Sequence, residues 1–469
     1  MKTWQKAFLL AAFTLVVTLG IWLKPTFFSP GARPPEQLNP FRLDGHQRLL
    51  ILAPHCDDET LGSAGLILAA RRLGMEVKVV IATNGDGYLF ATMKDFHRVY
   101  PHASDFIRMG ETRQRESLAA MQTLGLSSDQ VIFLSYPDRG TPEMWNNHWS
   151  ADRPYHSPYS RTVKSPYSTT YNPESVYAGE DYLADLLSIL NEYQPDLIVY
   201  PHPDDVHPDH WGLSAFTRLA VATEERNRPD FHPDLYAYLV HRPDFPEPKG
   251  LDPQRYLLPP SLLYNIYPDW EWLDLSSADA GLKSQAVAQY KSQLPLLKNL
   301  MESFVRANEL FTSPQPATLE TIFSGDGSTP DSWLDASGQA IQPVQKDPAK
   351  DFFTRDVLPP ADLLAVYLAK TQDGKLRMCA QVRGGARSAF TYTLQLKAVG
   401  SSTILQHTAT NDDVHPGQHK VELSDKYICD RIDLADLGDP WLFMVAAEVR
   451  DSLTGILDQA AWQLVYVKP

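Results

Sequence analysis

The first half of the chain alternates short apolar runs with stretches of helical spacing. Apolar runs of this length predict buried strands, and apolar positions repeated every three or four residues predict amphipathic helices. The expected strands lie at 49–53, 77–82, 131–134, 196–200 and 235–240, and the expected helices at 60–73, 107–124, 182–193, 213–225 and 283–311. Strands that alternate with helices build βαβ units. The pattern therefore predicts an α/β fold, with a Rossmann-like, mostly parallel sheet flanked by helices.

The pattern changes near residue 361, where alternating apolar and polar positions replace helical spacing. The expected strands, separated by turn residues, lie at 363–368, 376–382, 390–396, 419–423, 443–450 and 462–467. Short strands at this spacing predict a C-terminal all-β sandwich domain over 361–469. The polar segment 313–360 is expected to link it to a domain over 45–312, with few contacts across the boundary.

An uncharged, mostly apolar run covers Ala7 to Leu23. It lies at the short end of the length that spans a membrane, about 17–25 residues. The run predicts an N-terminal transmembrane anchor or a cleaved signal peptide within residues 1–24, followed by a Pro-rich linker over 25–44. We expect the anchor, because no clear small-residue cleavage site follows the run. Lys2 and Lys6 precede it, so the body of the chain is expected outside the cytoplasm, membrane-anchored or, after cleavage, exported.

Acidic and histidine side chains follow two of the predicted strands. They are His55, Asp57 and Asp58 after the strand 49–53, and His207, Asp209 and His210 after the strand 196–200. The carboxyl ends of strands in a parallel sheet meet at one edge, where ligands bind. Two clusters that are far apart in the sequence are therefore expected to converge.

Three of these residues form a candidate metal site. Histidine nitrogen and aspartate oxygen both bind zinc, and a catalytic zinc needs only three protein ligands. His55, Asp58 and His210 supply such a set, and Asp57 and His207 are left for proton transfer. A zinc ion in this site activates water and polarises a carbonyl group. The alternative is a loop of hydrated acids, and the presence of both clusters argues against it.

The residues of both clusters resemble the motifs of a known family. Pro54-His-Cys-Asp-Asp-Glu59 is similar to the Pro-His-x-Asp-Asp-Glu signature of the PIG-L / LmbE-like zinc-dependent N-acetylglucosaminyl deacetylases, and His207-Pro-Asp-His210 is similar to their second motif. The resemblance covers roughly residues 45–315, with Cys56 as a departure at a variable position. It implies amide hydrolysis with Zn²⁺ or another divalent metal, and it implies that Asp57 is the general base.

Other residues are candidates for supporting roles. His207 is the expected acid or oxyanion stabiliser, and Asp209 is expected to accept a ring N–H from a metal-binding histidine. Arg113 lies one helical turn from Glu116, so it either forms an exposed pair with it or takes a substrate-binding or loop-anchoring role. Asp138, at a strand end, is a candidate acceptor for a sugar hydroxyl.

The segment 138–182 is long and rich in Tyr, Trp, Ser and Pro. Long insertions of this kind are functional loops or disordered segments. Aromatic rings stack on sugar faces, so one interpretation is a carbohydrate groove. The other is a loop that uses its aromatic side chains to pin itself to the domain.

Composition narrows the class of partner. Hydrophobic residues make up 43% and charged residues 21% of the 469 residues, as in globular proteins. A net charge of −15 argues against nucleic-acid binding, which needs a basic face. Cys379 and Cys429 either form a disulfide in an exported protein or remain two buried thiols. His407, His415 and His419 are expected to be surface residues.

These observations favour a zinc-dependent hydrolase that removes acetyl from an N-acetylated amino sugar in an N-acetylglucosamine-type glycan, glycolipid or glycoconjugate. One alternative is a carbohydrate-binding envelope protein with a vestigial metal site, and the complete ligand set argues against it. Another is a metal hydrolase that acts on an ester or a non-sugar amide, which nothing in the sequence separates from the first.

Overall fold

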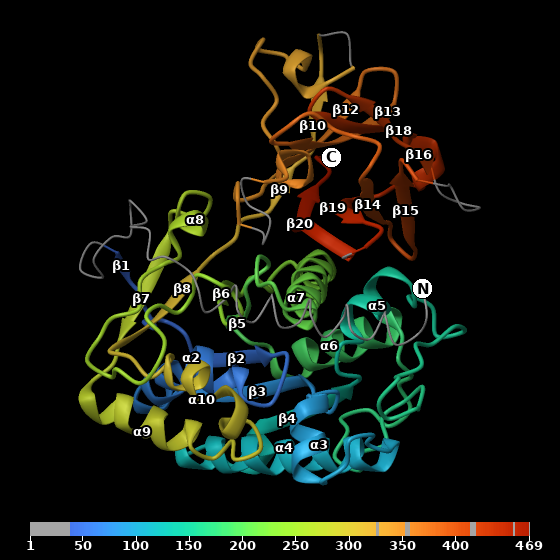
Figure 1. The fold of residues 1–469 in the computed structure, drawn as a ribbon. Helices are drawn as coiled ribbons and strands as arrows, with labels where there is room; N and C mark the ends of the chain where they lie inside the picture. Colours follow the sequence, from blue (N-terminus) through green and yellow to red (C-terminus); the bar gives the residue numbers. More distant parts are fainter. Residues whose placement is uncertain (1–37, 325–327, 352–356, 413–418, 454, 469) are drawn as a thin grey trace.

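An eight-stranded sheet organises residues 39–312 of the computed structural model, which describes residues 38–324, 328–351, 357–412, 419–453 and 455–468 (Figure 1). The strand order is β1-β7-β8-β6-β5-β2-β3-β4. The strands are β1 (Asn39–Pro40), β2 (Arg48–Ala53), β3 (Glu76–Thr83), β4 (Val131–Tyr136), β5 (Leu197–Pro201), β6 (Asp234–Tyr238), β7 (Trp270–Asp274) and β8 (Asn308–Thr312). Neighbours from β6 to β4 pair in parallel, whereas β8 runs antiparallel to β6 and β7.

The strand order reverses between β2 and β5. These strands pair directly, with Leu50 opposite Ile198. From β2 the chain proceeds outward through β3 and β4 on one side, and from β5 to β6 on the other. In open α/β sheets, ligand sites lie at such a switch point, outside the carboxyl ends of the strands. The loops that follow β2 and β5 therefore lie beside one another.

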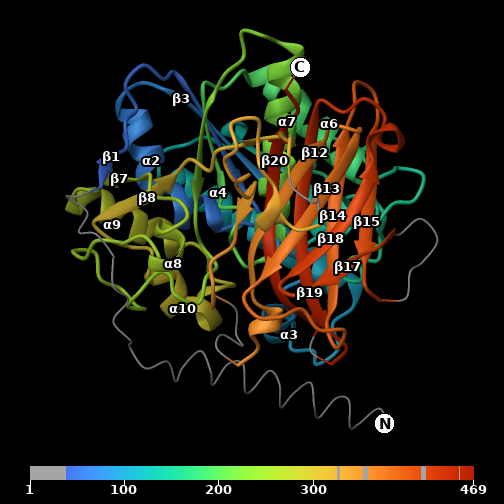
Figure 2. The same ribbon diagram turned by 90° about the horizontal axis from the view of Figure 1, so that it is seen from above.

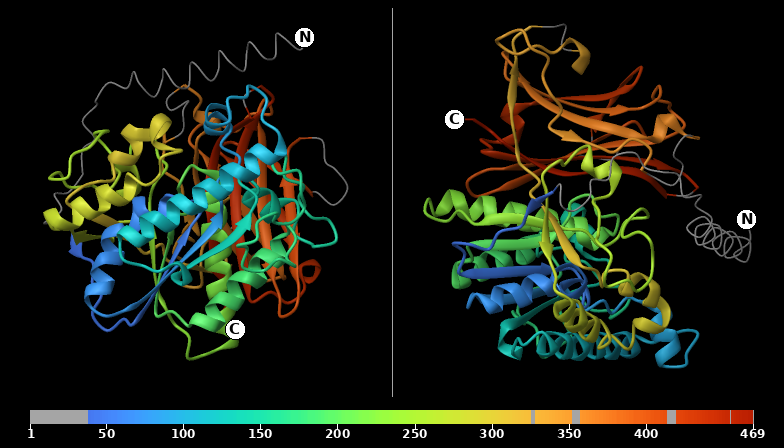
Figure 3. Two further views of the ribbon diagram at one scale, coloured as in Figure 1. Left: turned by 90° about the horizontal axis from the view of Figure 1, so that it is seen from below. Right: turned by 90° about the vertical axis from the view of Figure 1, so that its left-hand side faces the viewer.

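Helices cover both faces of this sheet (Figures 1 and 3). One face carries α2 (Asp58–Arg72), α4 (Ala103–Thr123), α9 (Ser277–Val287) and α10 (Leu294–Glu302), and the other carries α5 (Thr141–Asn146), α6 (Gly179–Tyr193) and α7 (Pro208–Asn227). Shorter helices are α3 (Leu89–Asp95), α8 (Ser261–Tyr264) and the 3₁₀ turns η2 (Ser128–Gln130), η3 (Pro330–Ser332), η4 (Pro359–Ala361) and η5 (Leu434–Leu437). Ile51 belongs to the core under α2, whereas Leu50 and Leu52 belong to the core under α6 and α7. Burial on both faces explains why the central strands are almost continuously apolar.

Two further sheets form a sandwich, whose strands run side by side in Figure 2. One has the order β10-β12-β13-β18-β17 with β11 beside β12, and the other has the order β16-β15-β14-β19-β20-β9. The strands are β9 (Ala317–Thr318), β10 (Glu320–Ile322), β11 (Gln345–Lys346), β12 (Leu363–Thr371), β13 (Lys375–Val382), β14 (Thr391–Val399), β15 (Ile404–Thr410), β16 (His419–Lys420), β17 (Glu422–Ser424), β18 (Tyr427–Asp433), β19 (Leu442–Asp451) and β20 (Gly455–Tyr466). Val366, Leu394 and Phe443 contribute to the apolar core of the sandwich.

The sandwich is stacked on the helical layer that contains α7, as the right-hand view of Figure 3 shows. Arg218 on α7 donates hydrogen bonds to the carbonyl oxygen of Trp462 at 2.9 Å and to Oε1 of Gln463 at 2.6 Å. Trp462 and Met444 of the sandwich belong to the same apolar cluster as Phe216 of α7. Many contacts therefore cross the boundary, contrary to the expectation from the polar segment between the two parts.

The secondary structure differs from the prediction in two segments. Residues 283–311 are not one helix, because α9 and α10 are short and Asn308–Thr312 is fully buried as β8. The expected linker 313–360 carries β9, β10 and β11, which pair with β20 and β12. Strands of two or three residues are too short to show an alternating pattern, so the sequence did not reveal them.

One element of the predicted fold class is corrected. In the part of the chain that the structure describes, no helix is long and apolar enough to cross a membrane. The apolar run from Ala7 to Leu23 lies outside the described residues. The predicted N-terminal transmembrane segment is therefore without support and is withdrawn.

Cys379 on β13 and Cys429 on β18 face one another in adjacent strands and form a disulfide. This settles the alternative that the sequence left open between a disulfide and two thiols. The bond joins positions 50 residues apart in the sequence. Closing a loop of this length restricts the unfolded chain.

We expect Cys379→Ala/Cys429→Ala to lower the free energy of unfolding by about 2–4 kcal/mol, because the unfolded chain regains the entropy of the open loop. Thermal unfolding with and without a reducing agent measures the effect. Reductant should lower the melting temperature of the natural protein towards that of the double variant and leave the variant unchanged. A reductant effect of equal size in both proteins would contradict this explanation.

Lys397 on β14 is a buried lysine where the sandwich meets the helical layer of the first domain. Its side chain is 0% exposed, and Nζ has no hydrogen-bond partner among the described residues. The ammonium lies 4.3 Å from the ring centroid of Trp149 and 5.0 Å from that of Trp145. Burial lowers the pKa of Lys397 to about 7. The rings favour the cation, but the loss of hydration outweighs them.

This burial predicts a pH-dependent stability. An unfolded lysine titrates near 10.4, so between about pH 7 and 10 the unfolded chain binds a proton that the folded protein does not, and stability rises with pH by up to about 1.4 kcal/mol per unit. Urea unfolding of the natural protein and of Lys397→Met over this range isolates the contribution. The stability of the natural protein relative to the variant should rise with pH, and parallel profiles would oppose the prediction.

Candidate metal centre

Two helices begin at the edge of the sheet where the strand order reverses. After β2, a short loop leads into α2, which starts at Asp58. After β5, a second loop leads into α7, which starts at Pro208 with His207 as its N-cap. Proline fits the first position of a helix because its nitrogen needs no hydrogen-bond acceptor there. Both loops thus present histidine and aspartate side chains at helix N-termini on neighbouring strands.

Histidine and aspartate side chains from both motifs meet at this edge. His55 Nδ1 lies 3.1 Å from Asp58 Oδ2, and His210 Nε2 lies 3.0 Å from the same oxygen. His241, which follows β6, brings its ring to 4.6 Å from that of His210. One ligand-type atom from each of the four residues lies within 4.8 Å of the others. The structure therefore brings together His55, Asp58 and His210, with His241 as a fourth side chain.

The donor set fits a divalent metal ion. Asp58 Oδ1 and both ring nitrogens of His210 are buried without a hydrogen bond, although the neighbouring carboxylates are close. Burial alone would lower the pKa of His210, but the carboxylates of Asp205 and Asp58 raise it to about 9. The site therefore favours positive charge at a point surrounded by nitrogen and oxygen atoms, which is the environment that a divalent cation needs.

Asp57 is held beside this cluster in a strained conformation. Its φ is 149°, a value that L residues rarely adopt and that clusters at functional sites. Arg113 Nη2 lies 3.2 Å from Asp57 Oδ2 and donates to the carbonyl oxygen of Cys56 at 2.8 Å. Burial raises the pKa of Asp57 to about 7; the guanidinium of Arg113 opposes this rise, and the charge of Asp58 adds to it. Asp57 is thus a carboxyl group poised to exchange a proton near neutral pH.

Arg113 does not form the exposed pair that its spacing from Glu116 suggested. The side chain of Arg113 is buried, and Nη1 donates to the carbonyl oxygen of Gly85 at 2.9 Å. A Cβ at Gly85 would lie 1.7 Å from Nη1, so only glycine fits there. Glu116 instead accepts hydrogen bonds from the backbone and side chain of Ser292. A direct role of Arg113 in substrate binding stays a prediction.

His207 packs against the cluster from the helix start. Its ring lies 4.6 Å from that of His55, and Nδ1 accepts a hydrogen bond from the backbone N–H of Asp209 at 3.3 Å. Burial and the neighbouring histidines keep the pKa of His207 well below its usual value. A neutral ring with Nδ1 occupied as an acceptor carries its proton on Nε2. His207 is therefore neutral, and its Nε2–H is available as a hydrogen-bond donor.

Two carboxylates face the other nitrogen of His55. Asp209 Oδ2 lies 3.2 Å from His55 Nε2, and Asp138 Oδ1 lies 3.4 Å from it. Asp209 is itself fixed by the backbone N–H groups of Arg139 and Thr141, at 2.7 and 3.1 Å. Asp209 thus lies where a carboxylate orients a metal-binding imidazole, and Asp138 borders the same ring.

Sequence reasoning missed Asp205 and gave no firm role to His241. Asp205 Oδ2 lies 3.0 Å from His210 Nδ1 and accepts the backbone N–H groups of Val240 and His241, at 3.1 and 2.9 Å. Its other oxygen accepts the backbone N–H of His207 at 2.9 Å. The sequence did contain a signal for Asp205, because it lies between His202 and His207, and a carboxylate in that position can orient a neighbouring imidazole ring.

Buried rings pin the aromatic segment 138–182 to the domain, and a carbohydrate groove along it stays a prediction. Tyr167 and Tyr177 are buried, and the hydroxyl of Tyr167 donates to Asp86 Oδ2 at 2.8 Å, so these rings pin the segment to the sheet. Tyr155 and Tyr159 are half-buried. A Cβ at Gly87 would lie 2.5 Å from the Tyr159 ring and 2.9 Å from Asp138 Oδ2, so this tyrosine borders the metal centre.

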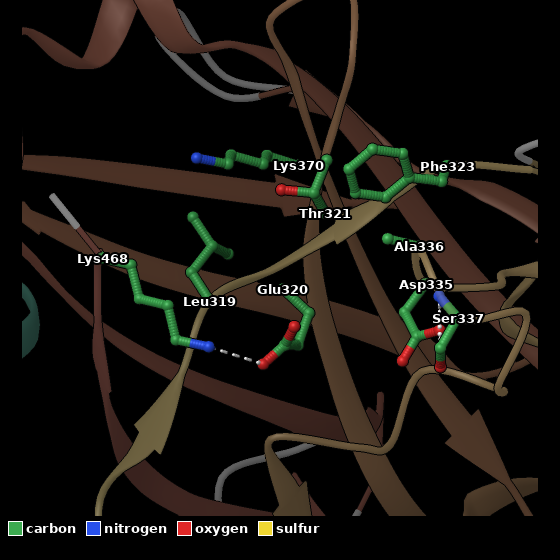
Figure 4. Close-up of a pocket in the computed structure, with 9 residues that line it drawn as sticks. All are labelled: Leu319, Glu320, Thr321, Phe323, Asp335, Ala336, Ser337, Lys370 and Lys468. Carbon is green, nitrogen blue, oxygen red and sulfur yellow. Dashed lines mark hydrogen bonds and ion pairs between the residues drawn. The ribbon is translucent and has the colours of Figure 1, made fainter.

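Two features of the sandwich lie apart from this centre. His407 is buried, not at the surface as expected, and its Nε2 lies 2.6 Å from Asp430 Oδ2, whereas His415 lies outside the described residues. Figure 4 shows a pocket of about 320 Å³ between β10 and the turn at Asp335–Ser337, where Lys468 pairs with Glu320 at 3.3 Å. No side chain of the metal centre lines this pocket.

Comparison with known proteins identifies the domain. Residues 50–221 match the PIG-L family, described as GlcNAc-PI de-N-acetylase. The match covers less than half of the chain, and the part of the chain that contains it, up to residue 312, is called the PIG-L domain below for this similarity. The matched residues contain both motif loops, and the helices that start at Asp58 and Pro208 are part of the domain.

Curated relatives are similar to part of this chain. Identity is 29% over 188 residues with 1D-myo-inositol 2-acetamido-2-deoxy-alpha-D-glucopyranoside deacetylase of Mycobacterium sp. strain KMS, across 39% of this chain and 53% of the relative. It is 27% over 190 residues with the enzyme of the same name from Corynebacterium urealyticum, across 38% and 50%. The chain spans about half the length of the curated relatives it matches. A solved structure, N,N'-diacetylchitobiose deacetylase of Pyrococcus horikoshii, aligns with a TM-score of 0.35 and 16% identity over 66% of this chain and 92% of that chain.

The contacts of Asp205 generate a prediction for the PIG-L domain. Asp205→Asn should lower metal affinity by about 10–100-fold, because carboxylates that orient metal-binding histidines contribute this much. Metal content after dialysis against graded chelator measures it, with the exposed Asp269→Asn as a matched control. Unchanged metal retention in Asp205→Asn would show that His210 needs no such partner.

Proposed function

We propose that this chain is a metal-dependent hydrolase that removes acetyl from an N-acetylated amino sugar, with zinc as its metal. The observation that carries the proposal is the convergence of His55, Asp58 and His210 beside Asp57. The match of residues 50–221 to a family described as a de-N-acetylase supports amide hydrolysis. The names of the curated relatives support an acetamido sugar as the class of substrate.

His55, Asp58 and His210 would hold the metal ion, and His241 lies within reach of the same position. A bound zinc ion would polarise the acetyl carbonyl and make a neighbouring water more acidic. Nitrogen and carboxylate ligands of this kind suit zinc.

Asp57 acts as the general base in this proposal. Its carboxylate takes a proton from the attacking water, and Arg113 and the strained backbone fix its direction. Burial raises the pKa of Asp57 to about 7 in the metal-free protein, and a carboxyl group with a raised pKa can first accept and then return a proton. The same carboxyl group then delivers that proton to the leaving nitrogen of the amino sugar.

His207 stabilises the negative charge that develops on the carbonyl oxygen. The neutral ring, with Nδ1 engaged by the backbone of Asp209, leaves its Nε2–H free to donate. A fixed donor aimed at developing charge contributes most in a buried site where water does not compete. The ring packs against the rings of His55 and His241, which limits its movement.

Tyr155, Tyr159 and Asp138 are the proposed contacts to the sugar. The rings of the two tyrosines are half-buried beside glycines, and Asp138 lies between Tyr159 and His55. Aromatic rings offer a flat apolar face with a polar edge, and a carboxylate accepts a hydroxyl proton. This arrangement suits a pyranose ring whose acetamido group points towards His55.

We also infer that the protein works outside the cytoplasm. The disulfide between Cys379 and Cys429 supports this, since disulfides persist in oxidising compartments. Mass spectrometry of protein alkylated directly in cell extracts tests the inference, and two free thiols in these positions would contradict it.

The roles of the paired aspartates generate the decisive experiment. Asp57→Asn should retain metal and lose about 10²–10⁴-fold of turnover, because it removes the proton acceptor. Asp58→Asn should lose metal affinity instead, because it removes a ligand. Metal content and acetate release from a panel of N-acetyl sugars measure both effects in the full chain. Equal metal loss in the two variants would reverse the roles, and no acetate release from any acetylated sugar would overturn the proposed substrate class.

A further inference from the structure

A second cluster of carboxylates lies at the junction between the PIG-L domain and the sandwich. Asp347 and Asp351 follow β11, and Asp458 belongs to β20. One carboxylate oxygen from each lies within 4.8 Å of the others. Asp347 is 6% exposed and Asp458 3%, and the side chain of Asp351 is 14% exposed. Three acidic groups are thus packed together away from water.

The protein neutralises this cluster only in part. Arg242 Nη1 lies 3.6 Å from Asp351 Oδ2, but the same guanidinium binds Asp244 through Nε at 3.1 Å. Asp458 accepts hydrogen bonds from the backbone of Leu363 and Gln459, at 2.6 and 2.9 Å. Among the residues that the structure describes, one shared arginine and two backbone groups face the three carboxylates, which leaves excess negative charge in a buried place. Uncompensated buried charge of this kind is strongly unfavourable.

Asp347 provides a second, separate observation. Its Oδ2 is buried and has no hydrogen-bond partner among the residues that the structure describes. Asp351 Oδ1 is in the same situation. Burial and the charges of Asp458 and Asp351 raise the pKa of Asp347 well above its usual range. Protonation of Asp347 would remove its charge and let its O–H bond to a neighbouring carboxylate, so a cluster of protonated acids is the alternative to a bound cation.

A bound cation satisfies the charge and the unpaired oxygens together. The cluster offers carboxylate oxygens and neither a nitrogen nor a sulfur ligand, so it differs from the histidine-rich metal centre. Ca²⁺ binds six to eight oxygen atoms in irregular geometry, including carboxylates, backbone carbonyls and water, whereas Mg²⁺ needs a strict octahedron and retains water. We propose that Asp347, Asp351 and Asp458 form a calcium site within the sandwich, next to the Arg242 segment of the PIG-L domain.

The position of this calcium site links it to the loop that carries the second motif. Arg242, which pairs with Asp351, follows His241 and donates to the carbonyl oxygen of Asp204 at 3.3 Å. Asp204 Oδ2 accepts the hydroxyl of Tyr267 at 2.6 Å. Asp205, the next residue, faces His210. A cation bound by Asp351 and Asp458 therefore lies beside the segment that carries His241 and Arg242.

Calcium titration of the purified, zinc-loaded full chain tests the proposal. Calorimetry should show one calcium ion bound per chain with a dissociation constant between about 10⁻⁶ and 10⁻³ M. Calcium should raise the melting temperature by several degrees, because it binds only the folded protein. Magnesium at the same concentration should have a smaller effect.

Two variants separate a calcium site from a cluster of protonated acids. Asp347→Asn should weaken calcium binding by about tenfold or more, since affinity follows the number of charged ligands. Without calcium it should melt at a higher temperature than the natural protein, because one repulsive charge is gone. Asp436→Asn, an exposed residue of the sandwich, should behave like the natural protein in both measurements.

The outcomes that overturn the proposal are distinct. Absence of calcium binding by the natural protein would refute the site directly, with no need for a variant. Equal calcium affinity in the natural protein and Asp347→Asn would place the ion elsewhere. Tighter binding of magnesium than of calcium would refute the identity of the cation. None of these results bears on acetate release, so the proposed function is tested separately.

Discussion

The pairing of β2 with β5 is the contact on which the metal centre depends. Their first motif residues are about 150 positions apart in the sequence, yet the register that sets Leu50 opposite Ile198 brings the two strand ends together. A shift of one residue in this register would move Ile51 out of the core under α2 and Leu50 out of the core under α6 and α7. His55 and His210 therefore meet because of packing under α2 and α7, not because of any contact between themselves.

The electrostatics of the centre follow from which groups face each imidazole. His55 lies between Asp58 on one side and Asp209 and Asp138 on the other, and His210 lies between Asp58 and Asp205. Helix N-termini supply partial positive charge to the same place. Arg113 adds a full charge against Asp57 alone. Burial raises the pKa of Asp57 to about 7, whereas the histidines beside Asp58 outweigh its burial and hold the pKa of Asp58 well below its usual range.

Much of this arrangement can be predicted from the sequence. The residues and strands that could not be predicted depend on pairing between strands that are far apart in the chain. Strand ends and helix starts were readable because apolar runs stop abruptly at His55 and at the segment before His207, and the strand order then forces convergence. His241 and Asp205 were not assigned because their roles arise from the pairing of β6 with β5, which no local pattern encodes. β8 was read as helix because its burial depends on β6 and β7, which lie far from it in the sequence. The short strands β9 to β11 depend likewise on partners in β12 and β20.

The apolar cluster shared by α7 and the sandwich limits how far either half of this chain could be exchanged for another during evolution. α7 presents Phe216 and Leu219 to a core that also contains Leu442, Met444 and Trp462, so the helix has apolar neighbours both towards the sheet and towards the sandwich. A PIG-L domain without this sandwich would need polar side chains on the outer face of the equivalent helix, because an exposed apolar patch of this kind promotes aggregation. Recombination that exchanged one half of this chain for another would therefore fail unless it also replaced the outer face of α7. The two halves are modular in sequence and inseparable in their packing.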